Sequence, residues 1–214
     1  SLRSSVRSAT TSVAFAGSIS GMVLNRHQLS LGSTNDAPSI TVTNLGQYDN
    51  DDDEDIMHKA NSSVLTVDAL SAYSDDVIKI LSGATLTISG TETLTALDVN
   101  NAGTLTSGGA GTFTVAGSWA NTGTFNASTE TVTFTATATG KTLSGTLNGT
   151  SDFYKVNFNG SGGGWTIQDA MLVSAADATD TLQVTAGTVT LGNGNGDNLD
   201  VRGKFVIAAS ATFQ

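Results

Sequence analysis

The chain has 214 residues, a mass of 21.7 kDa and a formal net charge of −10 at pH 7, with only 13% charged residues. Its 9 Lys and Arg against 19 Asp and Glu argue against nucleic acid as a partner, because neutralising phosphates requires a basic patch. The absence of cysteine excludes disulfides and thiolate metal sites. Thr is the commonest residue, followed by Gly, and this composition favours strands and tight turns over helices.

Residues 1–35 are predicted to form an extended N-terminal arm. They carry Arg3, Arg7 and Arg26, and the first acidic residue is Asp36, so a weakly basic arm precedes an acidic body. No apolar run here or elsewhere approaches the roughly 20 residues needed to cross a bilayer. We therefore expect no membrane span.

Residues 36–60 are predicted to be an acidic loop or linker, which contains the run "YDNDDDEDIMHK". Carboxylates at alternating positions could supply part of the roughly six to eight oxygen ligands that Ca²⁺ takes. The candidate metal ligands are Asp49, Asp51, Asp53 and Asp55. The run is not an EF-hand, because no Gly follows the acidic residues. A solvated acidic linker without an ion is the alternative, and no cofactor other than calcium is indicated.

From residue 61 to residue 214 the sequence repeats one phrase, in which a small residue and Gly are followed by Thr and an apolar residue. Examples are "SGATLTIS" at Ser82, "AGTLTSG" at Ala102 and "AGTVTLG" at Ala186. One apolar position recurs with a degenerate period of about twenty. The predicted inward-facing series is Leu86, Leu105, Phe125, Leu147, Ile167, Val189 and Phe205.

Within each repeat, apolar residues alternate with Thr, most clearly between Thr131 and Thr139. Short strands that repeat at one coil's length predict an all-β parallel β-helix or β-solenoid over residues 61–214. In such a fold each coil buries its apolar face against its neighbours. A β-sandwich is the alternative, since it also has many short strands, but a sandwich does not require a repeated phrase.

Two glycine-containing motifs resemble ligand-binding loops. Gly140-Lys141-Thr142 has the ending of a P-loop, but position 135 is Thr where a P-loop needs Gly, and no helix can follow in "LSGTLNGTS". We therefore predict a strand over 131–139 and a turn at Gly140. "GNGNGD" at Gly192 partly matches a calcium-binding β-roll, but a single imperfect copy is more typical of a turn.

Three longer segments, "GSWANTGTFNASTETVTFT", "SDFYKVNFNGSGGGWTIQ" and "LQVTAGTVTLGNGNGDNLDV", carry a resemblance to a known class. They resemble the Gly- and Thr-rich β-helical repeats of large bacterial secreted and cell-surface proteins, which are often described as adhesin-like. The resemblance covers residues 117–214. It implies a β-helical fold and an extracellular or cell-surface location, and it supplies no catalytic residues.

The aromatic residues are a candidate surface for stacking sugars. Trp119, Trp165, Tyr154 and Phe158 are more typical of core positions, whereas alternation places Phe153 on the outer side. A glycan- or surface-binding module therefore depends on Phe153, on a tryptophan or on the calcium loop.

No catalytic residue is predicted, so we expect no enzyme. A polysaccharide-active β-helix needs carboxylates clustered on one face, but Asp75 and Asp76 are adjacent and point to opposite sides of a strand. His27 and His58 lie far apart and lack the spacing of a zinc site.

The sequence thus favours an extracellular structural protein that forms or contributes to a surface fibre, sheath or adhesin stalk. The strand pattern continues to Gln214 without a polar cap, so we expect a longer chain or another subunit to cover this end. Head-to-tail assembly through the N-terminal arm would give a filament. The alternative is a glycan- or surface-binding module, and a polysaccharide-active enzyme is less favoured.

Overall fold

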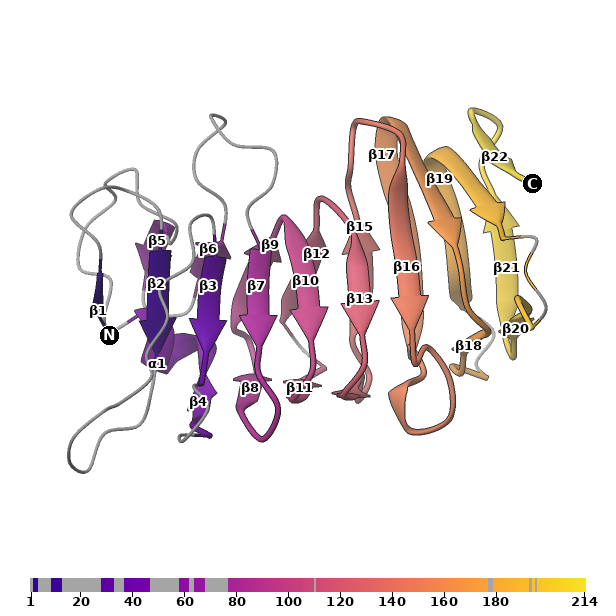
Figure 1. Ribbon diagram of the computed structural model, residues 1–214. Helices are drawn as coiled ribbons and strands as arrows, with labels where there is room; N and C mark the ends of the chain where they lie inside the picture. Colours follow the sequence, from indigo (N-terminus) through magenta and orange to yellow (C-terminus); the bar gives the residue numbers. More distant parts are fainter. Residues whose placement is uncertain are drawn as a thin grey trace.

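The chain folds as a parallel β-solenoid, which confirms the predicted fold class and excludes the β-sandwich (Figure 1). The structure is a computed structural model that describes residues 2–3, 9–12, 28–32, 37–46, 58–61, 64–67, 77–109, 111–176, 179–192, 194 and 196–214. Successive coils contribute short strands that pair in parallel with the coils before and after them.

The strands stack into three faces that follow one another along each coil. The first face contains β3 (Gln28–Leu31), β7 (Val77–Ile80), β10 (Asp98–Asn101), β13 (Trp119–Asn121), β16 (Lys141–Gly145), the second halves of β17 (Lys155–Ile167) and β19 (Asp180–Leu191), and β22 (Ala211–Phe213). The second face contains β4 (Ser39–Thr41), β8 (Thr85–Ile88), β11 (Thr104–Ser107), β14 (Thr124–Asn126), β18 (Met171–Val173) and β20 (Leu199–Val201).

The third face contains β6 (Val64–Val67), β9 (Thr93–Ala96), β12 (Thr112–Val115), β15 (Thr131–Phe134), the first halves of β17 and β19, and β21 (Lys204–Ile207). The long strands β17 and β19 bend from the third face into the first, so these two faces form one continuous sheet (Figure 1). The described helical elements are α1 (Val42–Gly46) and the 3₁₀ helix η1 (Gly149–Ser151).

The strands described before Val64 lie within this architecture. β2 (Ala9–Ser12) pairs in parallel with β3, and β3 pairs with β7 of the first face. Two neighbouring strands run the other way: β1 (Leu2–Arg3) is antiparallel to β2, and β5 (His58–Asn61) is antiparallel to β6. The parallel sheets therefore begin ahead of the predicted solenoid boundary, at strands that the sequence placed in an arm.

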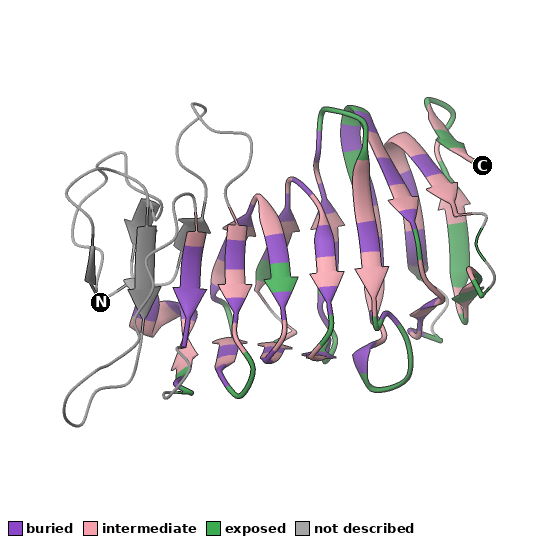
Figure 2. Cartoon of the chain, viewed as in Figure 1, coloured by how far each residue is buried: buried purple, intermediate pink, exposed green. Residues whose placement is uncertain are grey.

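Alternation of side chains explains why these segments are strands. β8, β9 and β11 read Thr-Leu-Thr-Ile, Thr-Leu-Thr-Ala and Thr-Leu-Thr-Ser, and every second residue is buried. Figure 2 shows the same alternation of buried and partly exposed residues along the strands. The apolar residues fill the interior, while Thr, which is β-branched and suits a pleated surface, faces outward.

The predicted inward-facing series is buried from Leu86 to Val189, as expected, whereas Phe205 is 39% exposed. The series does not form a single column of register partners. Leu86, Leu105 and Phe125 are register partners, but Leu147 pairs with Met171, and Ile167 lies on the first face. The cause is a change in coil length. On the third face the register partners Leu94, Phe113 and Val132 are equally spaced in the sequence, whereas the next partners, Val156 and Leu182, follow at longer intervals.

The added length is accommodated by local changes at the coil corners. Beside β14 the next coil has η1, and the Ser151 hydroxyl accepts the N–H of Phe125 at 3.0 Å. β15 ends at Phe134, so the strand predicted over 131–139 is too long, and Ala138, expected inside, is exposed. The chain turns at Gly140, whose φ is +84°, as predicted.

Aromatic rings from all three faces meet in the interior. Trp119 is central, with ring centroids at 4.9 Å from Phe125, 5.3 Å from Phe153, 5.8 Å from Phe113 and 6.4 Å from Phe134. All five side chains are fully buried, and most of the ring pairs are tilted or edge-on, which favours their quadrupole interaction. This cluster holds the middle coils together.

Two buried asparagines connect successive coils at the corner between the first and second faces. Asn101 Nδ2 donates to Asn121 Oδ1 at 2.8 Å and to the Thr124 carbonyl at 2.9 Å. Asn121 Nδ2 donates in turn to the Thr146 carbonyl at 2.7 Å. Both asparagines are 0% exposed, so their polar groups depend on these hydrogen bonds.

We expect Asn121→Ala to lower the free energy of unfolding by about 1–3 kcal/mol, because it removes the hydrogen bonds to the buried Asn101 amide and to the Thr146 carbonyl. Asn100→Ala is the matched control, since Asn100 is exposed on the neighbouring strand position of β10. Urea denaturation followed by circular dichroism measures both changes. Equal effects in the two variants would contradict a stabilising ladder.

Candidate functional site

A column of polar turns precedes the third face, and it contains two buried carboxylates. Glu92, Gly111 and Glu130 stand immediately before β9, β12 and β15, in adjacent coils. Glu92 is 6% exposed and Glu130 is 4% exposed. A Cβ on Gly111 would lie 1.9 Å from the Glu92 carbonyl oxygen, so the middle position accepts only glycine and leaves space beside Glu130.

Glu92 has partners for both of its carboxylate oxygens. Oε1 accepts hydrogen bonds from the Thr43 N–H at 2.8 Å and from the Thr43 hydroxyl. Oε2 accepts the N–H of Ser89 at 2.5 Å. The carboxylate therefore closes its own turn and fastens it to α1 of the preceding coil.

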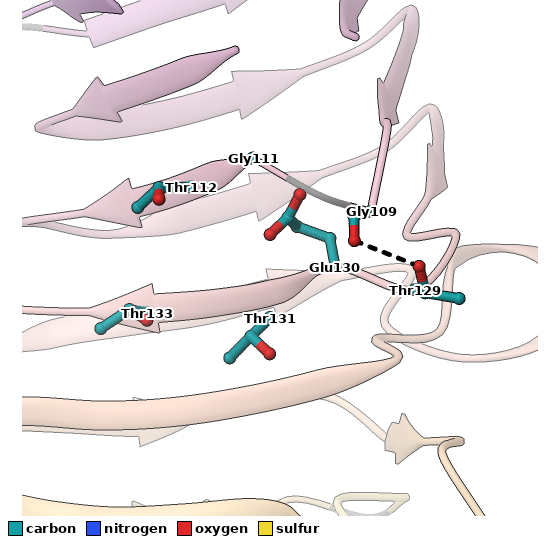
Figure 3. Close-up of a pocket in the computed structure, with 7 residues that line it drawn as sticks. All are labelled: Gly109, Gly111, Thr112, Thr129, Glu130, Thr131 and Thr133. Carbon is teal, nitrogen blue, oxygen red and sulfur yellow. Dashed lines mark hydrogen bonds between the residues drawn. The ribbon is translucent and has the colours of Figure 1, made fainter. Parts of the chain in front are cut away.

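The carboxyl group of Glu130 is less completely hydrogen-bonded than that of Glu92. Its carboxyl group lies beside Gly109 and Gly111 at the wall of a pocket of about 340 Å³ (Figure 3). The pocket is lined by Gly109, Gly111, Thr112, Thr129, Glu130, Thr131 and Thr133. Within the described residues, Glu130 Oε2 has no hydrogen-bond partner.

Burial raises the pKa of Glu130 above its ordinary value of 4.5, because the charged form loses hydration. Backbone hydrogen bonds from Thr131, Gly109 and Gly111 lower this pKa, but they do not outweigh the burial. The described lining of the pocket contains no second titratable side chain and no cation. Glu130 thus favours its protonated form in the folded chain more than in the unfolded chain.

Because its pKa is raised on folding, Glu130 stabilises the folded state as the pH falls. The free energy of unfolding should rise as the pH drops from neutrality through the folded-state pKa, and this rise should end near the ordinary value of 4.5. In Glu130→Gln the rise should be absent, and the variant should be more stable than the original protein at neutral pH. Urea denaturation at a series of pH values measures this.

Glu92→Gln is the matched comparison at the equivalent turn. An amide has one acceptor oxygen in place of two, so this change should destabilise the protein at neutral pH by about 1–3 kcal/mol. The two Glu→Gln variants should therefore move stability in opposite directions. A shift of the same sign in both would contradict the different environments of the two carboxylates.

Other acidic side chains also accept hydrogen bonds from backbone N–H groups. Asp98 Oδ1 accepts the N–H of Ser118 at 2.6 Å, and Asp169 Oδ2 accepts the N–H of Gly145 at 2.6 Å. Asp197 closes the glycine-rich turn by accepting the N–H of Gly194 at 2.6 Å. The Asp197 carboxylate, part of the β-roll match, is used within its own turn.

The predicted calcium ligands Asp49, Asp51, Asp53 and Asp55 lie outside the described residues. Within the described ranges, no three His, Asp or Glu side chains gather closely enough to hold a metal ion. Calcium binding by residues 49–55 stays a prediction.

The prediction that Phe153 faces outward is wrong. Phe153 is 0% exposed, and Trp119 and Trp165 are 0% and 1% exposed. Phe153 lies on the second face, bridged to Val173, before the chain turns into β17, so the alternation of β17 does not extend to it. These three rings therefore form core and offer no sugar-stacking surface.

Sequence reasoning missed the carboxylate turns and the asparagine pair. A signal was present: "SGTE" and "ASTE" each precede a Thr-x-Thr strand, and Asn101 and Asn121 each stand two residues before a Gly-Thr pair. The sequence alone does not show which residues of the neighbouring coil lie beside these side chains, and the backbone of that coil supplies most of their hydrogen-bond partners.

Comparison of the chain with known protein families, curated proteins and solved structures found no match. The longest described α-helix, α1, has 5 residues, and no described helix has the length and apolarity to cross a bilayer.

Proposed function

We propose that this protein is an extracellular structural protein, which forms or contributes to a surface fibre, sheath or adhesin stalk. The observation that carries the proposal is the uninterrupted stack of parallel coils from β3 to β22, held by backbone pairing along three faces. Such a stack is a stiff spacer whose length grows with the number of coils. The Gly- and Thr-rich repeats support an exterior location through their resemblance to adhesin-like proteins.

The coil of β20, β21 and β22 is the candidate contact surface for self-association. Phe205 is 39% exposed and Ile207 is 46% exposed, although their register partners Leu182 and Val184 are 0% and 1% exposed. These side chains point into the interior of the solenoid and are covered on one side only. β20, β21 and β22 each have one described strand partner, so their other edges can pair with a further coil, either of the same chain or of a neighbouring subunit.

Stacking of another solenoid end on this coil would cover the apolar side chains and pair the free backbone groups together. Contact between unlike ends does not close on itself and would therefore propagate into a filament. At the other end, the short antiparallel strand β1 lies at the edge of the first face. The proposed contact joins the end that carries β1 and β2 to the β20–β22 coil of a neighbour.

The test is the double variant Phe205→Ser/Ile207→Ser. We expect the original protein to form rods that lengthen with concentration in electron micrographs, and the variant to remain at monomer length. Val206→Ser is the matched control, because Val206 lies between the two residues but pairs with the partly exposed Gln183 on the outer side of β21. Analytical ultracentrifugation gives the masses.

Two results would contradict assembly through the last coil. One is a monomer of the original protein at all concentrations, and the other is equal association of both variants. Saturable binding of the original monomer on a glycan array would instead support the glycan-binding alternative.

A further inference from the structure

The third face presents a regular array of threonines to solvent. Its outward positions in β9, β12 and β15 are all Thr, with partners in register across the strands. The array consists of Thr93, Thr95, Thr112, Thr114, Thr131 and Thr133. Each of these residues is partly or fully exposed, whereas the residues between them are buried.

The array is regular in both directions. Neighbouring strands in a sheet are about 4.8 Å apart, and alternate residues along a strand are about 6.7 Å apart. The coils that carry the array have equal length, since the register partners Leu94, Phe113 and Val132 are equally spaced in the sequence, and no bulge interrupts the columns. A ligand that contacts the whole array must have a matching two-dimensional repeat.

The side-chain chemistry of the array further limits the class of ligand that it can bind. It has no charged and no aromatic side chain, although the chain carries a net charge of −10. Polysaccharides are commonly held by exposed aromatic faces, and the aromatic rings of the middle coils are in the core. Each Thr instead offers one methyl group and one hydroxyl group, and a hydroxyl both donates and accepts hydrogen bonds.

The hydroxyl groups are free to take such a ligand. Within the described residues, none of the six Thr hydroxyls makes a hydrogen bond to another side chain or to the backbone. The outward residues of the first face are chemically more varied. Asn100 is the register partner of Lys79, so this column of the first face contains a charged side chain. The array on β9, β12 and β15 is thus uncharged and periodic, and its Thr131 column continues into Lys155 of β17.

The pocket at the edge of the array adds a buried carboxyl group to this surface. It is lined by Thr112, Thr131 and Thr133 of the array and by Glu130, whose buried Oε2 has no partner among the described residues (Figure 3). Its volume of about 340 Å³ exceeds the share of about 30 Å³ that one water takes in the liquid, and its lining is polar. Ordered water is the ligand that suits both the pocket and the array.

We propose that the threonine array of the third face binds the surface of ice. Hydroxyl groups that repeat at two regular spacings can join a lattice whose oxygen atoms also repeat in two dimensions, as they do in ice, while methyl groups fill the spaces between oxygens. Waters held in the Glu130 pocket extend the ordered layer at the edge of the array. This inference does not depend on assembly into a fibre.

The experiment measures thermal hysteresis, the gap between the melting and freezing temperatures of an ice crystal in protein solution. We expect the original protein to give a concentration-dependent gap and faceted crystals. Thr114→Tyr places a bulky ring at the centre of the array and should abolish both. Asn100→Tyr places the same ring on the first face and should leave both unchanged.

Circular dichroism and urea denaturation show whether each variant is folded. A second variant, Thr95→Lys, disrupts the array by charge and keeps the test valid if Thr114→Tyr does not fold. Absence of hysteresis in the folded original protein would overturn the proposal. Equal loss in Thr114→Tyr and Asn100→Tyr would also overturn it, as would binding of polysaccharide by the array without any effect on ice.

Discussion

The structure depends on the parallel register between successive coils. A single coil has strands of three or four residues in its regular part and cannot bury its own apolar side chains, so its neighbours must supply both backbone partners and core. A shift of one residue would move every inward side chain to the solvent side. The buried aromatic cluster around Trp119 and the asparagine pair both stabilise this register, because each includes contacts between one coil and the next.

The same constraint explains the use of acidic residues. Carboxylates at coil corners, such as Glu92, Asp98 and Asp169, accept N–H groups that the strands leave unpaired. Glu130 is the exception, because Gly111 beside it leaves a pocket and one oxygen lacks a partner among the described residues. Its raised pKa is the electrostatic consequence of that packing.

The fold could be predicted from the sequence because its repeat is local. Leu86, Leu105 and Phe125 occur at similar intervals, and Thr-x-Thr strands alternate visibly, so the solenoid and its first columns followed directly. Leu147, Ile167 and Val189 are also buried as predicted, but they do not continue one column, because a longer coil and η1 shift the register. No pattern in one sequence shows which corner absorbs the added residues. The wrong placement of Phe153 has the same cause.

The most direct test of this account is amide hydrogen exchange resolved by strand. Stacked coils predict the slowest exchange in β10, β12, β13 and β15, where each strand has a partner on both sides, and progressively faster exchange toward β21 and β22 at the unpaired end. Uniform exchange along the chain would contradict the stacking of coils, as would stronger protection of β21 and β22 than of β12.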